Sequence, residues 1–209
     1  MAITTYTELK SAVADWLNRS DLSSAIENFI SLMETQTERS LRVRQMLVRA
    51  DAQIDTKYSA VPADFLQART IKLTSTTPNQ PVEFATDDQM DAYDAQRSAP
   101  GQPSRFSIVG GQIRVHPIPD AEYTAELNYY AKLPRLSAEN PTNWLLTMAP
   151  DVYLYGSLIQ SAPYLKDDAR MTVWSALFSE GLQAVRFADE GATSSRGVLK
   201  SRVKSFGAK

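Results

Sequence analysis

The sequence has no cysteine and only one histidine, His116, among its 209 residues. Without cysteine there are no disulfide bonds or thiolate metal sites, and a single imidazole leaves a transition metal short of ligands. No apolar run approaches the roughly 20 residues that span a bilayer. The start, MAITTYTELK, lacks a basic region followed by an apolar core, so we expect no secretory signal. These absences predict a chain without metal, cofactor or membrane partner.

Charge is distributed unevenly along a chain that is 43% hydrophobic, enough for a sizeable core. The formal net charge is −2, which gives no overall signature of nucleic-acid binding. Residues 192–209 nevertheless hold five bases and no acid, whereas the residues before them hold 17 of the 22 bases and all 24 acids. We therefore expect an acidic body that carries a flexible basic arm.

The stretch RFSIVGGQIRVHPIP, residues 105–119, raises the question of a phosphate or proton-transfer site. Polar and apolar residues alternate on both sides of Gly110 and Gly111, as in two strands joined by a two-residue turn. A phosphate-binding loop would need a helix after the glycines, but a strand follows. We interpret the stretch as a β-hairpin whose Gln112, Arg114 and His116 form a solvated polar row.

Helical periodicity marks the start of the chain. Thr5 or Thr7 can cap a helix over residues 5–18, with Glu8 near the positive end of its dipole. Ser20 or Asp21 then caps a second helix. The expected buried face of that helix consists of Leu22, Ile26, Phe29, Ile30, Met33 and Leu41.

The middle of the chain changes to short β-branched runs from about residue 48. They predict a small, mostly antiparallel sheet of about four to six strands. One of these strands places Tyr123, Ala125, Leu127 and Tyr129 on a single face. Thr86 is expected to begin a short helix within this region, TDDQMDAYDAQ.

Helices return after residue 138. Asn140 or Thr142 is the expected cap of a first turn, and Asp151 that of a helix that Pro163 ends or kinks. A long final helix follows and stops at Gly191. Its expected apolar side consists of Ala169, Val173, Trp174, Leu177, Phe178, Leu182 and Val185.

Together these elements predict an α+β fold that is mainly α. We expect a bundle of two N-terminal and two C-terminal helices, residues 1–47 and 138–191, with a small antiparallel β module, residues 48–137, inserted. Residues 192–209 form the flexible basic arm. The acid pairs at 87–88 and 167–168 fall at expected helix starts, where the helix dipole favours negative charge, and no catalytic constellation is present.

Several stretches resemble bacteriophage head-to-tail adaptor proteins, the head-completion or connector family. They include VPADFLQARTIKL, FSIVGGQIRVHPIP and AELNYYAKLPRLS, and the resemblance runs from Tyr6 to about Ala188. Its most specific piece is NPTNWLL…PDVYLYGSL…APYLKDDAR, in which aromatic, proline and acidic residues recur in a fixed order.

The resemblance implies structural work in the virion, at the head–tail interface, after synthesis in the host cytoplasm. Adaptors of this family form a ring with further copies of themselves, usually twelve, under the portal protein. The ring extends the channel for genomic DNA without sequence-specific binding and offers a surface to tail or nozzle proteins. The hairpin residues Gly110, Gly111, Gln112, Arg114 and His116 are then expected to face the tail.

The basic arm is the expected portal-binding element, because the matching segment of related short-tailed phages reaches into a groove of the portal. Its bases and apolar anchors are Arg196, Val198, Leu199, Lys200, Arg202, Val203, Lys204 and Phe206. An alternative is a nucleic-acid-binding protein whose arm contacts phosphates. A cell-wall hydrolase is a more distant alternative, for which Glu34, Glu38, Asp167 and Asp168 are the available carboxylates.

Overall fold

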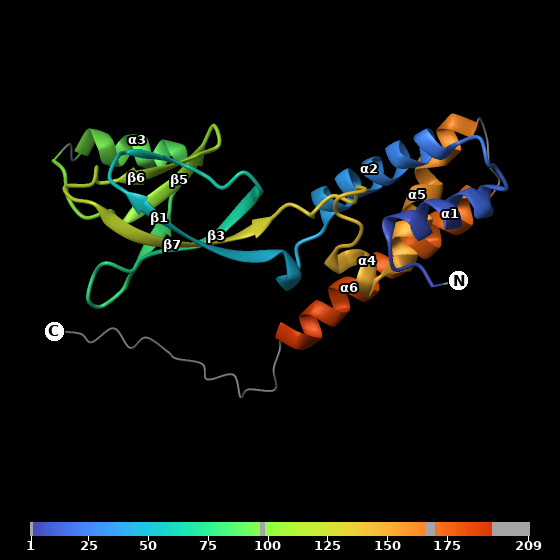
Figure 1. Cartoon of the computed structure of the whole chain (residues 1–209). Coiled ribbons are helices and arrows are strands. Elements are labelled where there is room, and N and C mark those ends of the chain that lie inside the picture. The colour runs from blue at the N-terminus through green and yellow to red at the C-terminus, as the bar shows by residue number, and fades with distance from the viewer. Residues whose placement is uncertain (1, 97–98, 166–169, 194–209) are drawn as a thin grey trace. The chain divides into compact units, whose positions relative to one another are not determined.

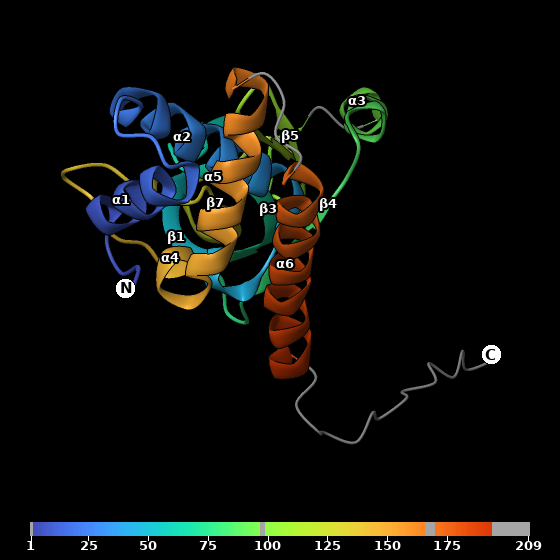
Figure 2. The same ribbon diagram turned by 90° about the vertical axis from the view of Figure 1, so that its right-hand side faces the viewer.

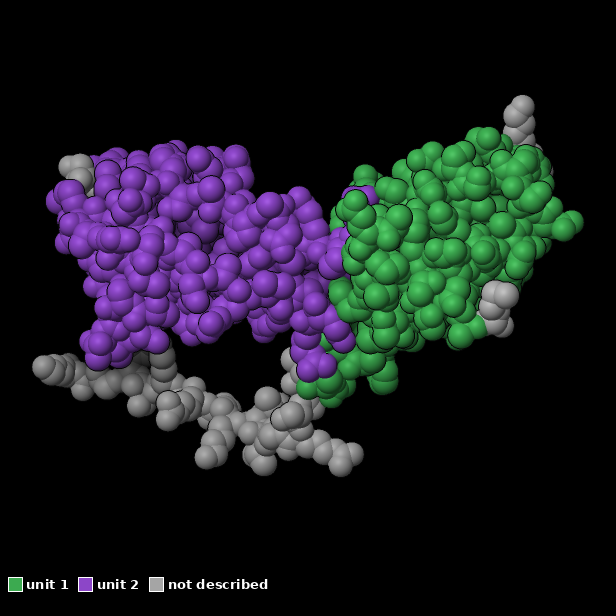
Figure 3. Space-filling model, in the orientation of Figure 1, with its two compact units in different colours: residues 1–41, 136–209 green, residues 42–135 purple. Residues whose placement is uncertain are grey.

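The structure is a computed structural model that describes residues 2–96, 99–165 and 170–193 (Figure 1). Its chain divides into two compact units (Figure 3). Residues 1–41 and 136–209 make a helical unit, and residues 42–135 make a β unit. Asp167, Asp168, Ala169 and the arm residues from 194 onward lie outside the described residues.

The helical unit is organised around one central helix. Its elements are α1 (Tyr6–Leu17), α2 (Ser23–Ser40), α4 (Trp144–Met148), α5 (Pro150–Leu165) and α6 (Met171–Thr193). Figure 2 shows α5 with α1 and α2 on one side and α6 on the other, and α5 contacts all four other helices. Within the described ranges, no helix is both long and apolar enough to cross a bilayer.

A glycine lets α5 approach its neighbours closely. A Cβ atom at Gly156 would overlap the Met33 side chain of α2 and would lie 2.8 Å from Phe178 Cε2 of α6. The three-helix contact therefore depends on the missing side chain, because packed interiors leave no room for an extra methyl group.

The helix ends follow local hydrogen bonds that sequence reasoning predicted in part. Thr5 caps α1 in a capping box with Glu8, as expected. The other expected caps are wrong: α2 follows Leu22 without a side-chain cap, Asn143 caps α4, and α5 already begins at Pro150. Proline fits a first helical position because that position needs no N–H bond. Pro163 lies in the last turn of α5, and α6 continues past Gly191.

In its described residues, the β unit contains one sheet of seven strands and one α-helix. The elements are η1 (Arg44–Met46), β1 (Leu47–Ile54), β2 (Tyr58–Ala60), β3 (Phe65–Leu73), β4 (Gln80–Phe84), α3 (Asp87–Gln96), β5 (Arg105–Val109), β6 (Gln112–His116) and β7 (Tyr123–Ala131). The strand order is β1-β7-β3-β4-β5-β6-β2. All pairs are antiparallel except β4 and β5, which run parallel.

The sheet nearly closes into a barrel. The two edge strands, β1 and β2, both contribute residues to the lining of one apolar cavity of about 230 Å³. The interior side carries the core, in which Ala125, Leu127 and Tyr129 of β7 are buried together, as the alternation predicted. The other main members of this core are Ile54, Ile71, Leu73, Val82, Phe106, Ile113 and Val115.

This architecture corrects the predicted fold class. A mainly helical bundle with a small antiparallel β module is wrong, because the sheet has seven strands, is mixed and is almost closed. The number of strands was underestimated because β1 lacks a clear alternation of polar and apolar residues. All of its residues from Val48 to Gln53 are exposed or half-buried. Such a two-sided polar pattern is typical of an edge strand.

Candidate functional site

The predicted hairpin is confirmed. β5 and β6 pair from Arg105↔His116 to Val109↔Gln112, which leaves Gly110 and Gly111 as the two turn residues. Their φ angles are +58° and +77°, the left-handed region that glycine reaches without steric cost. A Cβ atom at either glycine would meet no heavy atom within 4 Å, so the tip projects into open space.

The expected solvated row beyond the tip is wrong. Gln112 is exposed, but Arg114 and His116 are buried. Helix α3 packs on β5 and β6 and covers the face that the alternation assigned to solvent (Figure 1). A strand pattern identifies which residues share a face, but it does not say whether a helix covers that face.

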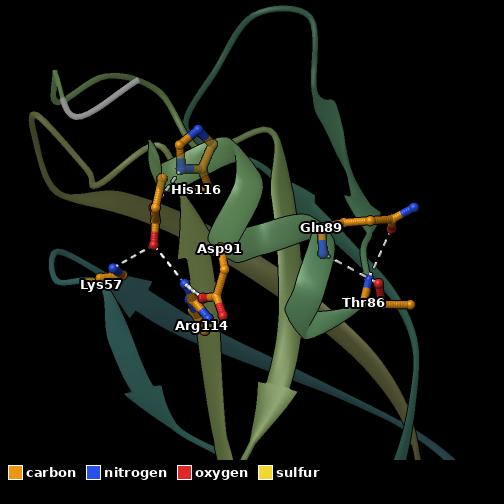
Figure 4. Close-up of polar contacts among 7 residues, drawn as sticks. Lys57, Thr86, Gln89, Asp91, Arg114 and His116 are labelled. Atoms are coloured by element: carbon orange, nitrogen blue, oxygen red, sulfur yellow. Dashed lines mark hydrogen bonds and ion pairs between the residues drawn. The ribbon is translucent and has the colours of Figure 1, made fainter. Parts of the chain in front are cut away.

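A polar network joins α3 to the sheet, and Asp94 is its centre. Lys57 Nζ and Arg114 Nη2 each lie 2.6 Å from Asp94 Oδ2. His116 Nδ1 lies 2.8 Å from Asp94 Oδ1, and Arg114 Nη2 also reaches Asp91 Oδ1 at 2.6 Å. Figure 4 shows Lys57, Asp91, Arg114 and His116 grouped where α3 faces β6.

The network fixes the charges of Asp94 and Arg114. Burial alone would raise the pKa of Asp94, but hydrogen bonds from Lys57, Arg114 and His116 outweigh burial and hold that pKa well below its usual range. The hydrogen bond to Asp94 raises the pKa of Arg114 further above its usual range, against the effect of burial. The pair thus stays ionised across ordinary pH.

Local contacts orient α3 over the network. Thr86 and Gln89 bond reciprocally at its start, where the Gln89 side chain accepts from Thr86 N–H and Thr86 Oγ1 accepts from Gln89 N–H (Figure 4). The ring centroids of Tyr93 and His116 lie 5.9 Å apart. The guanidinium carbon of Arg105 lies 4.2 Å from the Tyr93 centroid, over the ring. These contacts hold α3 on the β5–β6 strand pair.

In the helical unit the carboxylate of Glu34 is buried. Glu34 of α2 accepts hydrogen bonds from Leu136 N–H at 2.9 Å and from Tyr153 Oη at 3.0 Å. Asn143 Nδ2 lies 2.6 Å from the same hydroxyl, and burial raises the pKa of Tyr153 above its usual range. Glu34, an available carboxylate for the hydrolase alternative, therefore ties α2 to α5 and to the returning chain.

Helix α6 carries both buried and exposed apolar side chains. Trp174, Phe178 and Val185 are buried as predicted, whereas Val173, which was placed with them, is 59% exposed. Phe187 is 76% exposed and lines a shallow groove beside Glu180 and Glu190. Exposed apolar side chains rimmed by charges are typical of contact surfaces.

Sequence reasoning missed Asp94, Asp91 and Lys57. The signal that was available is their spacing: Asp91 and Asp94 are i and i+3 on a helix, opposite Arg114 and His116 at i and i+2 on a strand. No group of three or more potential metal ligands occurs in the described parts of the chain.

Comparison with known families gives one match of wide extent. The profile of a family described as SU10 adaptor protein matches residues 4–201, which cover all of the β unit and most of the helical unit. No curated protein matches the sequence.

Proposed function

Since the chain belongs to the SU10 adaptor protein family, a family of phage head-to-tail adaptors, we propose that it docks as a ring under the portal. In that position the ring extends the DNA channel and offers the attachment surface for tail or nozzle proteins. The observation that carries the proposal is the extent of the family match, residues 4–201. The family resemblance predicted from sequence is thereby confirmed.

The surfaces of both units suit this work. The exposed apolar residues of α6 suit contact with neighbouring copies, and a ring of identical subunits needs a heterologous interface that closes on itself. A twelve-copy ring is the expected form. The tail-facing role falls to the hairpin tip, Gly110 to Gln112, because Arg114 and His116 are buried against α3.

The portal contact is assigned to the basic arm, residues 192–209, on its composition. An acidic body with a basic arm suits assembly with oppositely charged partners. The same five bases favour one second candidate, an arm that contacts DNA phosphates. The two candidates differ in salt dependence, because phosphate contacts release counterions and weaken steeply as salt increases.

Sedimentation of the purified protein, alone and with portal rings, tests the proposal. The free protein should be monomeric or weakly associated at micromolar concentration and should form a ring on the portal. A stable ring in the absence of portal would contradict the prediction that assembly depends on the portal, but it would agree with the predicted ring. Binding to DNA as a monomer, without any portal complex, would favour the second candidate.

A further inference from the structure

The wall of the β unit has an opening where β4 ends. β4 pairs with β3 only at Ile71–Leu73 and with β5 only at Glu83 and Phe84. Around the end of β4, the first half of β3 together with Phe106 and Ile108 of β5 lines a groove of about 360 Å³. Beyond Phe84, where β4 ends, no strand of the described residues lies between β3 and β5. We call this groove the β3–β5 opening, lined by residues 65–69, Phe84, Phe106 and Ile108.

The strand directions leave room for one more strand. β3 is antiparallel to β4, and β4 is parallel to β5. A segment that continued the line of β4 would therefore run antiparallel to β3 and parallel to β5. Unpaired strand edges are templates for such added strands.

The backbone of β5 faces the opening at alternate residues. β5 pairs with β6 over its whole length, and the two-residue turn directs the backbone N–H and C=O of Val109 and Ser107 toward β6. On the other side of the strand, Phe106 O accepts from Ala85 N–H at 2.8 Å. The backbone groups of Ile108 point to the same side as those of Phe106, but β4 has already ended at Phe84. Among the described residues, no strand therefore pairs with β5 at Ile108 on the side that faces the opening.

The side chains around the opening define the chemistry of its occupant. Phe84 is 65% exposed and packs edge-on against Phe106, with ring centroids 5.5 Å apart. Phe65, half-buried, stacks on Tyr129 at 5.7 Å. Arg69 is exposed at the rim and is the charged residue of the lining. An apolar floor with a basic rim fits an extended segment with alternating apolar residues and one carboxylate.

We propose that the β3–β5 opening receives an extended segment of a different phage protein, which adds a strand to the sheet and places a carboxylate near Arg69. The chain's own arm is a poor occupant, because residues 192–209 contain five bases and no acid. The inference rests on the proposed function, since it requires the protein to be assembled into the phage particle.

The absence of cysteine makes a specific test possible. Ala68→Cys supplies a single thiol in the opening, to which a benzophenone photocrosslinker is attached before assembly into particles. We expect cross-links to one segment of another virion protein. Arg69→Glu in this background should lower their yield at least tenfold, whereas the matched Arg69→Lys should change it by less than about twofold. Cross-links to another copy of this chain, or equal yields from both variants, would overturn the proposal.

Amide exchange on the unsubstituted protein gives an independent measurement. Peptides that cover residues 65–69 and 107–109 should exchange at least tenfold more slowly in particles than in the free protein. If the protein is present in particles but these peptides exchange at the free rate, the added strand is refuted while the adaptor role stands. If the protein is missing from particles and from portal rings, the proposed function itself fails.

Discussion

Asp94 is the residue on which the polar contacts between α3 and the sheet converge. Asp94→Asn would remove the carboxylate that holds Lys57, Arg114 and His116. The positive charge of Arg114 would stay buried but would lose one of its two carboxylate partners. We therefore expect the free energy of unfolding, measured by urea titration, to fall by about 2 kcal/mol. Asp91→Asn is the matched control: its side chain is 71% exposed, so its loss should cost less than about 1 kcal/mol.

The same residue predicts a dependence on pH. The folded-state pKa of Asp94 is lowered, so its ionic contribution is complete above the unfolded pKa of about 3.9 and is lost as pH falls through the folded pKa. The difference in unfolding free energy between the unsubstituted protein and Asp94→Asn should therefore shrink between about pH 5 and pH 2. A constant difference over that range would show that Asp94 does not act through its charge.

At the scale of elements, the packing of α5 depends on Gly156. Gly156→Ala places a methyl group against Met33 and Phe178, and we expect it to lower the free energy of unfolding by about 1–2 kcal/mol despite the better helix propensity of alanine. Gly191→Ala, with no heavy atom within 4 Å of the new Cβ, should be neutral or stabilising by up to about 1 kcal/mol. Thermal unfolding of both variants measures the contrast, and equal losses would contradict the packing argument.

The hairpin is the second element with a sharp test. Gly110→Val demands a positive φ of a β-branched residue, which we expect to cost about 1–2 kcal/mol locally and to distort the tip. Particles with this variant should retain the protein on capsids but lack tails in electron micrographs. Gly110→Asn is the control, because asparagine tolerates this region of φ. Capsids that lose the protein as well would argue against a tail-facing hairpin.

Elements with strong local signals were predictable from sequence. Thr5 and Glu8 supply both halves of the box that starts α1, and Gly110-Gly111 supplies the turn of the hairpin. The size of the sheet was not predictable, because β1 lies at an edge and has no clean alternation. The parallel pairing of β4 and β5 was not predictable either. The two strands can run in the same direction because α3 connects them, and this arrangement depends on tertiary packing.

The site was less accessible to sequence reasoning than the elements. The polar row was identified, but its environment was not: Arg114 and His116 are covered because α3 brings Asp94 to them. The β3–β5 opening has no sequence signature at all. The opening exists because β4 ends at Phe84 while its neighbours β3 and β5 continue. Which strands are neighbours of β4 is known only from the three-dimensional structure.

At the scale of the whole molecule, deletion of the basic arm tests whether the arm docks the protein on the portal. Deletion of residues 192–209 should abolish binding to portal rings and leave the melting temperature unchanged, because the folded units keep their contacts. Sedimentation with portal and calorimetry measure the two effects. If the truncated protein fills the portal ring normally, the arm is not the docking element. If binding survives but capsids lose DNA, the arm faces the channel.

The order of the units along the chain has a consequence for biosynthesis. α1 and α2 emerge from the ribosome before the β unit, whereas α5, which contacts both, follows it. About 110 residues separate α2 from α5, so at roughly 5–20 residues per second the nascent N-terminal helices wait on the order of 5–20 s for their partner. The β unit is contiguous and can close during this interval. The helical unit is therefore the last to be completed, and its early apolar faces are the part of the nascent chain most in need of a chaperone.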